Sequence, residues 1–404
     1  MQPTDSKWTV GFWGARDRYE VAAAMAETGQ LERLVSDFYC PELIGRAILA
    51  MPHISADSFV AKAAGRNHEL IPFAAFDTAV GMRWLRKCAP RDPVSRSELI
   101  GYRSAEVANR SRSGLLIYSY EVEIAARTLG RDLPLVVFQV HPTPSHVRRV
   151  MKRLRLAEPA LPFEPEERLT EIVVHRHLAA LQRASAVICS SSFVRSGLID
   201  DGVDPARIAL VPYGVSSEVP QTMHAHRPEG EALKVGWLGQ PTTRKGFDVF
   251  IGALHALRRR DVEVRIIGRC PGSISELFPR WSRVTFSGPV SEEAKFAELV
   301  ELDVFVAPSR LEGYGLSIHE ALAVGVPVIG TANSMVADLR TAPETHGVIS
   351  VQVGSPAALA EALESLGTDF TRDVLTRGAI RRVVARRTWP AFREGVRACV
   401  NSMP

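Results

Sequence analysis

The chain has 404 residues, which at roughly 100–200 residues per domain predicts two domains or one large barrel and excludes a small disulfide-stapled fold. Hydrophobic residues make up 46% and charged residues 23%, so neither a disordered nor a fibrous chain fits. The formal net charge of +4 is a mild basic excess that suits nucleotides, phosphates or an anionic membrane. It is too small to favour nucleic-acid binding.

Cysteine usage and the N-terminal residues bear on the compartment. The five cysteines are an odd number, lie far apart and include no C-x-x-C pair, which speaks against a disulfide framework or a zinc site. Residues 1–7 are polar, and no run approaches about 18 uninterrupted apolar residues. We therefore expect a cytoplasmic protein whose contact with a membrane would be peripheral, on the cytoplasmic face.

Apolar, β-branched runs alternate with amphipathic stretches, a pattern typical of βα units around buried parallel sheets. The strands predicted in the first half are Trp8–Trp13, Gly114–Tyr118, Leu135–Val140, Ala186–Cys189 and Ile208–Val211. The polar segment 216–231, broken by proline and glycine, predicts a linker.

In the second half, the predicted strands are Lys234–Leu238, Val262–Ile267, Val284–Phe286, Val304–Ala307 and Val326–Ile329. A helix follows the first of them, and Ser291 is a good N-cap for another, with Glu292 and Glu293 in its first turn. The pattern predicts an α/β protein with two Rossmann-like domains that face each other across a deep inter-domain cleft. In open parallel sheets the loops after the strands carry the chemistry.

One such loop lies in VGWLGQPTTRKGFDVF, residues 235–250, and contains Arg244 and Lys245. An arginine fork beside a compact lysine charge can hold a diphosphate and neutralise the charge that grows on it. The alternative is a solvated surface pair. The loop is not a G-x-x-x-x-G-K-[ST] P-loop, and GFWG at 11–14 is not G-x-G-x-x-G, so kinase and simple NAD-binding functions are disfavoured.

The most informative segment is APSRLEGYGLSIHEALAVGVPVIG, residues 307–330. Glu312 and Glu320 bracket Gly313 and Gly315, whose backbone N–H groups can approach a ligand closely. A helix predicted from about Ser317 would point its positive end at a phosphate. The alternative is structural: Ser317 and Glu320 can form a capping box, and the next Gly and Pro simply end the helix.

A basic segment, residues 144–156, places Val147, Val150 and Leu154 on one stripe of a predicted helix. Its cations are Arg148, Arg149, Lys152, Arg153 and Arg155. Such a helix can lie on anionic lipid, or it can be a solvated helix packed on its own domain. A second basic cluster, Arg83, Arg86, Lys87 and Arg91, surrounds Trp84 and Leu85.

Together these segments resemble the retaining GT-B glycosyltransferases with an E-x7-E signature, glycosyltransferase family 4 or glycosyl transferases group 1. The matching pieces are EGYGLSIHE at 312–320, the A-x-G-x-P-V-I run at 323–329, RKGFDVFIGAL at 244–254 and SGPVSEEAKFAELVELDVFVAPS at 287–309. ASAVICSSSFVRSGLIDDGV with ARIALVPYGV resembles the end of the family's N-terminal domain, and TWPAF resembles its closing helix.

The resemblance implies an organisation for the whole chain. An acceptor-binding domain would span residues 1–215, and the linker 216–231 would lead to a nucleotide-sugar-binding domain over 232–385. A closing helix within 386–404 would pack back on the first domain. With the acceptor in the first domain, its basic clusters make lipid-linked or anionic glycan acceptors plausible.

It also implies residue roles in the second domain. Arg244 and Lys245 match the basic pair that grips the donor diphosphate. Glu320 matches the acid that binds the ribose hydroxyls, and Glu312 the acid near the donor sugar. Backbone groups that contact the nucleotide sugar are expected at Gly239, Gly313, Tyr314, Gly315 and Leu316.

In the first domain, Gly14 in GFWG matches a glycine of the family's loop near the phosphates. His141 falls where the family often has a histidine that reaches the donor sugar, and a structural histidine is the alternative. His319 and the His175/His177 pair lack further ligands in the sequence and are expected to be structural or surface residues rather than a metal site.

The residues and the resemblance together predict a retaining, metal-independent glycosyltransferase of envelope glycan or polysaccharide biosynthesis, such as that of lipopolysaccharide. Its donor would be a UDP- or GDP-type nucleotide-diphosphate sugar, and its acceptor a glycan or lipid-linked glycan. No cofactor and no nucleic acid are expected. The alternatives are a sugar-nucleotide epimerase or hydrolase of the same fold and a non-catalytic sugar-nucleotide-binding subunit.

Overall fold

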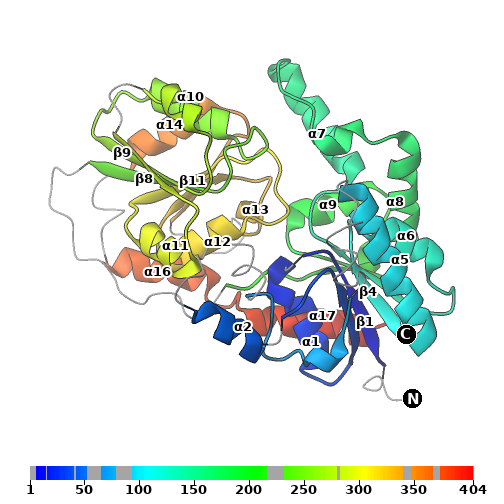
Figure 1. The fold of residues 1–404 in the computed structure, drawn as a ribbon. Coiled ribbons are helices and arrows are strands. Elements are labelled where there is room, and N and C mark those ends of the chain that lie inside the picture. The colour runs from blue at the N-terminus through cyan, green and yellow to red at the C-terminus, as the bar shows by residue number, and fades with distance from the viewer. Residues whose placement is uncertain are drawn as a thin grey trace.

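A computed structural model of the chain describes residues 6–14, 16–40, 42–51, 65–78, 93–215, 232–279, 283–339, 347–366 and 374–403. Within these ranges the strands form a seven-stranded sheet, in the order β3-β2-β1-β4-β5-β6-β7, and a six-stranded sheet, in the order β10-β9-β8-β11-β12-β13. The two sheets lie in separate lobes (Figure 1). We call each sheet with its helices the N-terminal and the C-terminal lobe.

The N-terminal lobe is a parallel sheet covered by helices. Its strands are β1 (Trp8–Gly11), β2 (Leu31–Ser36), β3 (Phe76–Thr78), β4 (Gly114–Tyr118), β5 (Leu135–Gln139), β6 (Ala186–Cys189) and β7 (Ile208–Leu210). Gly11 pairs with Ile117 and Tyr118 with Phe138, so β1, β4 and β5 end at one edge of the sheet. Every residue of β4 and β5 is buried, as expected of strands covered on both faces.

The helices of this lobe are α1 (Glu20–Ala26), α2 (Glu42–Leu49), α5 (Pro93–Ser111), α6 (Val122–Thr128), α7 (Pro144–Ala157), α8 (Glu171–Arg183) and α9 (Ser192–Asp200). Local sequence fixes where several begin. Thr143, Thr170 and Ser191 are N-caps whose hydroxyls accept from the backbone N–H three residues on. A short 3-10 turn, η4 (Pro165–Arg168), lies between α7 and α8.

The C-terminal lobe repeats this plan. Its strands are β8 (Leu233–Leu238), β9 (Val262–Ile267), β10 (Arg283–Gly288), β11 (Val304–Ala307), β12 (Val328–Thr331) and β13 (Val348–Val351). Its helices are α10 (Phe247–Ala256), α11 (Glu292–Val300), α12 (Leu316–Ala323), α13 (Val336–Leu339), α14 (Pro356–Ser365) and α16 (Val374–Val384). Trp237 and Phe250 stack at 5.8 Å in its core.

The ten predicted strands are all present, and their ends differ from the prediction by up to two residues. The largest shift concerns the strand predicted at Val326–Ile329, which runs from Val328 to Thr331. The N–H of Val326 donates to the carbonyl of Ala321 and so closes α12. The strands β2, β3 and β13 were not predicted. The sheets themselves confirm the predicted α/β class.

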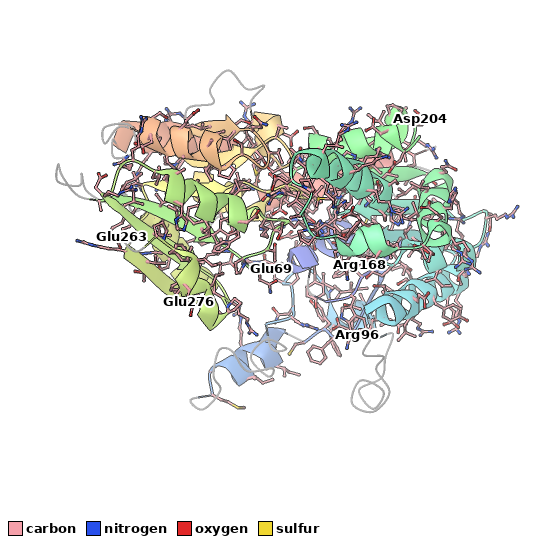
Figure 2. All side chains as sticks on the ribbon, turned by 90° about the horizontal axis from the view of Figure 1, so that it is seen from above. Glu69, Arg96, Arg168, Asp204, Glu263 and Glu276 are labelled. Carbon is pink, nitrogen blue, oxygen red and sulfur yellow. The ribbon has the colours of Figure 1, made fainter. Side chains whose placement is uncertain are left out.

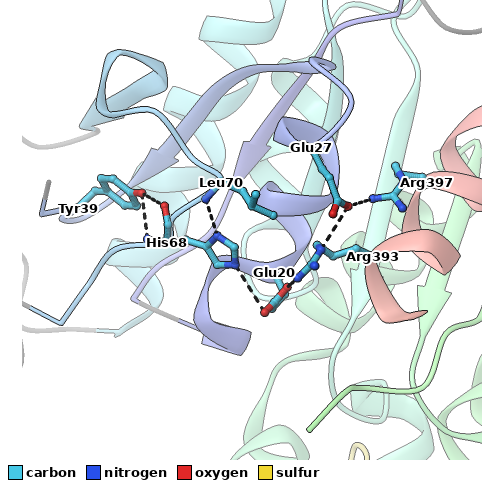
Figure 3. Close-up of polar contacts among 7 residues, drawn as sticks. All are labelled: Glu20, Glu27, Tyr39, His68, Leu70, Arg393 and Arg397. Carbon is cyan, nitrogen blue, oxygen red and sulfur yellow. Dashed lines mark hydrogen bonds and ion pairs between the residues drawn. The ribbon is translucent and has the colours of Figure 1, made fainter. Parts of the chain in front are cut away.

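The last helix, α17 (Trp389–Asn401), lies against α1 of the N-terminal lobe (Figure 1). Figure 3 shows the polar contacts that join them: Arg393 donates to Glu20 at 2.7 Å and to Glu27 at 3.3 Å, and Arg397 also pairs with Glu27. Glu20 faces His68 as well, at 3.6 Å. The chain thus returns to its first lobe after completing the second.

The predicted linker 216–231 and the basic cluster at Arg83, Arg86, Lys87 and Arg91 lie outside the described residues. The predicted domain boundaries therefore stay predictions.

Across the described ranges, no helix is both long and apolar enough to cross a membrane. Seen from above, Glu263 and Glu276 mark the C-terminal lobe, and Arg168 and Asp204 mark the N-terminal lobe (Figure 2).

Candidate functional site

The two lobes touch at Gly313, inside the E-x7-E segment. A Cβ on this residue would lie 2.0 Å from the carbonyl oxygen of Val140 and 3.0 Å from Nδ1 of His141. The hydroxyl of Ser191 donates to the Gly313 carbonyl at 2.6 Å. Only glycine allows this approach. We call residues 312–315, the part of the E-x7-E segment before α12, the signature loop. This loop therefore lies directly against the carboxyl end of β5, beside the predicted His141.

The loop between β8 and α10 brings Lys245 to the same segment. Gly246 caps α10 with φ 73°, and a Cβ there would lie 2.0 Å from the Pro308 carbonyl, so the loop packs tightly on the end of β11. Gly239, with φ 126°, turns the chain out of β8 and lies near the Lys245 stem. Lys245 Nζ donates to Glu312 Oε1 at 2.9 Å. Two residues predicted from separate motifs thus form one ion pair.

Arg244, next to Lys245, reaches across to the N-terminal lobe. Its Nη1 donates to Oε1 of Glu166 in η4 at 3.0 Å. Burial lowers the pKa of the Arg244 guanidinium, but Glu166 and, less strongly, Glu312 raise it, and the net direction is upward. Arg244 Nη2 and Glu166 Oε2 are buried, and neither has a hydrogen-bond partner among the described residues. Both predicted diphosphate-binding cations therefore already have carboxylate partners.

Arg310 holds the loop that carries these cations, a role that sequence reasoning missed. Its buried guanidinium donates to the Thr243 carbonyl at 2.9 Å and to Asp248 at 2.7 and 2.8 Å. It also donates to Glu158, at the end of α7, at 2.6 Å. The backbone N–H of Arg310 also donates, to the backbone carbonyl of Arg244 at 2.8 Å. This one side chain ties the cation loop to both lobes.

Glu320 lies on α12 and pairs with a lysine from another helix. Lys295 Nζ of α11 donates to Glu320 Oε1 at 2.6 Å. The N-cap of α12 is Gly315, with φ 102° and no side-chain cap, so the capping-box interpretation of Ser317 and Glu320 is wrong. Leu316, the first residue of the helix, is exposed. The N–H of Ile318 donates to the Gly315 carbonyl at 3.0 Å, which leaves the N–H groups of Leu316 and Ser317 at the start of the helix outside its hydrogen-bond ladder.

Tyr314 has a buried side chain. Its hydroxyl donates a hydrogen bond to the Tyr213 carbonyl at 3.3 Å and accepts one from Arg387 Nη1 at 3.4 Å. Burial raises the pKa of this hydroxyl to about 12. Only its backbone is left for a ligand in the predicted role.

Gly14 and His141, the two predicted residues of the N-terminal lobe, follow β1 and β5, which have β4 between them in the sheet. Gly14 has φ 86°, and its N–H donates to Asp37 Oδ1 at 3.0 Å, so this amide is bound to Asp37 rather than presented to a ligand. The His141 ring meets the Tyr120 ring edge-on at 5.6 Å. The structure thus brings His141 to the signature loop, while the Gly14 amide has Asp37 as its acceptor.

A cavity of about 290 Å³ lies at the carboxyl ends of β9 and β10. It is lined by Gly268, Cys270, Pro271, Ile274, Phe286 and Gly288, among others. A smaller one, about 10 Å³, lies beside Lys245 and Ser317. The larger cavity was missed, although its position beyond two neighbouring strands could have been inferred from the rule for parallel sheets.

The remaining histidines are not grouped for metal binding. His319 and His177 are buried, and burial lowers their pKa values to about 3 and about 4. His175 is exposed and contacts the Glu171 carbonyl. In the described part of the chain, no group of three or more His, Cys, Asp or Glu side chains is placed to hold a metal ion.

The basic segment 144–156 forms most of α7. Val147, Val150 and Leu154 pack with Met151, Phe193 and Leu311 in a small cluster, so the protein itself covers the apolar stripe. Arg148, Arg149 and Arg155 pair with Glu171, Asp201 and Glu167, while Lys152 and Arg153 are exposed. This packing supports the alternative of a surface helix.

Each lobe is a parallel sheet covered by helices, and the loops that follow its strands face the other lobe. This arrangement defines a GT-B fold. Residues 232–369 match the family Glycosyl transferases group 1. The resemblance predicted from the sequence is thereby confirmed.

Two relatives with named functions match part of this chain in sequence. The chain is 28% identical over 271 residues to a D-inositol 3-phosphate glycosyltransferase of Stackebrandtia nassauensis, a match that covers 61% of this chain and 59% of that protein. It is 29% identical over 148 residues to the lipopolysaccharide core biosynthesis mannosyltransferase LpsB of Rhizobium meliloti, covering 34% and 42%. The chain thus matches only about half the length of these relatives.

Among solved structures, Anabaena HepE in complex with UDP and glucose matches with a TM-score of 0.62 and 14% identity, over 97% of this chain and 98% of that chain. At this identity the likeness concerns the fold.

Proposed function

We propose that the protein is a retaining glycosyltransferase that moves a sugar from a nucleotide-diphosphate sugar to a glycan or lipid-linked glycan acceptor. The observation that carries this proposal is the Lys245–Glu312 ion pair, 2.9 Å long, in a group 1 domain. It joins the cation loop to the E-x7-E loop where Gly313 touches the other lobe. The proposal places the diphosphate and the sugar ring at this junction.

In this proposal the donor extends along the carboxyl edge of the six-stranded sheet. The nucleobase occupies the cavity of about 290 Å³ beyond β9 and β10, whose lining is largely apolar or glycine. Glu320 binds the ribose hydroxyls, Arg244 and Lys245 bind the diphosphate, and Glu312 contacts the sugar. The complex of HepE with UDP and glucose supports a UDP-type donor, and a GDP-type donor is the other candidate.

Transfer requires stabilisation of the leaving diphosphate. Arg244, Lys245 and the N–H groups at the start of α12 can meet its growing charge, and each such donor contributes on the order of 2.7–4 kcal/mol to comparable reactions. We propose that these groups act without a divalent metal. Because each cation starts with a carboxylate partner, the donor competes with Glu166 for Arg244 and with Glu312 for Lys245.

For the acceptor, the relatives' names support envelope glycan or polysaccharide assembly, including that of lipopolysaccharide. The acceptor would bind the N-terminal lobe near His141 and Tyr120. Peripheral contact with an anionic membrane belongs to the same proposal, and Lys152 and Arg153 of α7 are the exposed cations that would serve it.

The test begins with calorimetric titration of UDP, GDP and ADP in the presence of EDTA. We expect one nucleotide to bind without metal. The matching nucleotide sugars are then incubated with and without glycan acceptors, and proton NMR of the product reports whether the anomeric configuration is retained.

Each alternative has its own outcome in these assays. Donor conversion without any acceptor would identify an epimerase or hydrolase instead. Nucleotide-sugar binding without turnover on any acceptor would identify a non-catalytic subunit. Binding only with Mg²⁺ or Mn²⁺ would overturn the metal-independent part of the proposal.

A further inference from the structure

Lys295 is a cation that the proposed donor site does not yet use. Its Nζ lies 2.6 Å from Glu320 Oε1, and the two side chains come from different helices, α11 and α12. They are 18% and 14% exposed. A pair this short and this buried restricts the glutamate far more than a surface ion pair does.

We propose that Lys295 is a positioning residue that holds the Glu320 carboxylate in the orientation needed to accept the ribose hydroxyls. The proposal rests on the proposed function, in which Glu320 binds the ribose. An ionised carboxylate has about four acceptor positions, so the bond from Lys295 leaves acceptor capacity for a diol. By fixing the carboxylate beforehand, the lysine removes a side-chain ordering cost from nucleotide binding.

The surroundings of Lys295 direct it toward Glu320. The other acid near it is Glu292, one turn earlier on α11, at 3.9 Å. Glu292 also pairs with Arg18 from the N-terminal lobe, so its charge is shared with a second cation. The Lys295 ammonium lies 4.9 Å from the Phe296 ring centre, a contact that further confines the side chain.

The competing explanation is that the pair merely fastens α11 to α12. A structural fastening would affect all ligands of the lobe alike, whereas a positioned carboxylate would affect only ligands that carry ribose hydroxyls. Discrimination between UDP or GDP and its 2′,3′-dideoxy form is therefore the decisive measurement. The loss of both hydroxyl contacts to the carboxylate corresponds to a change in affinity of about tenfold or more.

We expect the wild-type protein to bind the ribonucleotide about tenfold more tightly than the dideoxy form. Lys295→Met should lose most of this preference by weakening the ribonucleotide alone, and Lys295→Arg should restore it. Glu320→Gln should lose the preference too, and the double variant should lose no more than either single one. Lys234→Met, which removes a lysine paired with Glu301 elsewhere in the lobe, is the matched control and should leave it unchanged.

The outcomes separate the two proposals. If the wild-type protein binds neither nucleotide, or binds both forms equally, the proposed donor site is wrong. If it discriminates and Lys295→Met discriminates equally well, the positioning role is overturned while the site stands. A parallel loss of affinity for both forms also overturns it. Should Lys295→Met fail to fold, Lys295→Ala, which also removes the donor to Glu320 and suits a helix, is measured against the same criteria.

Discussion

Arg244 and Glu166 join the two lobes through a hydrogen-bonded ion pair of 3.0 Å, with side chains that are only 20% and 18% exposed. Arg244 follows the first strand of the C-terminal lobe, and Glu166 lies in the turn between α7 and α8 of the N-terminal lobe. The cation proposed to bind the donor diphosphate is thus held by an acid of the opposite lobe. A diphosphate and Glu166 compete for the same guanidinium.

Replacement of this acid should therefore favour the nucleotide. We expect Glu166→Gln to bind the nucleoside diphosphate several-fold to about tenfold more tightly, because Arg244 no longer has to leave a carboxylate. Calorimetric titration measures the change. Glu171→Gln, which removes the exposed partner of Arg148, is the control and should bind as the wild type does. Weaker binding by Glu166→Gln would mean that Glu166 supports the site instead of competing for it.

Glu312 should separate binding from turnover. Its carboxylate holds Lys245 at 2.9 Å, so Glu312→Gln frees this lysine for the diphosphate, and nucleotide affinity should stay equal or rise. Turnover with saturating donor should nevertheless fall about tenfold or more, because a contact to the reacting sugar acts mainly in the transition state. Steady-state kinetics and titration on the same preparation test both parts. A folded and fully active Glu312→Gln protein would refute the placement of Glu312 at the sugar.

Gly313 tests the contact between the lobes. A Cβ would meet the Val140 carbonyl at 2.0 Å, so Gly313→Ala must push the signature loop away from β5. We expect nucleotide affinity to change little and turnover to fall up to about 100-fold, as for displaced reacting groups in general. Gly378→Ala in α16, where a Cβ has room, is the matched control and should leave both unchanged. Equal turnover by Gly313→Ala and the wild type would show that this contact is dispensable.

The sequence was sufficient to predict all of the described strands except β2, β3 and β13, of which β3 and β13 lie at sheet edges. Runs such as 135–139 are apolar throughout most of their length, because helices cover both faces of these strands. In β2, Glu32 and Arg33 interrupt the run, since the start of this strand is only partly buried. The strand β13 is partly buried along its whole length, and β3 has three residues. The FDT of β3 carries a weak apolar signal, whereas the VISV of β13 is apolar and β-branched at three of four positions and could have been recognised.

For the site, sequence reasoning found the loops but not the contacts that hold them. Lys245 and Glu312 lie in recognisable motifs, and parallel sheets bring such loops to one edge. Glu166 lies 78 residues from Arg244, and Glu158 lies 152 residues from Arg310. No local pattern links residues at such separations. The partners of the predicted cations became visible only when the lobes were placed together.

Two buried histidines predict how stability depends on pH. Burial lowers the pKa of His319 to about 3 and that of His177 to about 4, from an ordinary value near 6.5. Below pH 6.5 the unfolded chain binds protons at these residues and the folded chain does not. The free energy of unfolding should therefore fall as the pH drops from 6.5 toward 4, by up to about 1.4 kcal/mol per pH unit for each histidine.

Denaturant titrations between pH 7 and 5.5 measure this slope. His319→Gln should reduce it, whereas His175→Gln, at an exposed position, should leave it unchanged. A slope that His319→Gln does not alter would show that His319 is protonated in the folded protein.

Cys270 provides a direct probe of the cavity proposed for the nucleobase. Its thiol lines the cavity of about 290 Å³ and is partly buried, and burial raises its pKa, so alkylation is slow and best followed near pH 8.5. Cys40, Cys189 and Cys399 are buried and should react more slowly still. Cys88 lies outside the described residues, so the experiment uses a Cys88→Ser background.

In that background, mass spectrometry follows iodoacetamide labelling of Cys270 with and without saturating nucleoside diphosphate. A base in the cavity covers the thiol, so we expect labelling to slow about tenfold or more with the nucleotide that the titrations select. Inorganic pyrophosphate, which can occupy the cation loop but has no base, should protect much less. Because the two ligands share the diphosphate, the difference between them reports the base alone. Equal labelling rates with and without a bound nucleotide would place the base elsewhere, while leaving Arg244 and Lys245 as the diphosphate site.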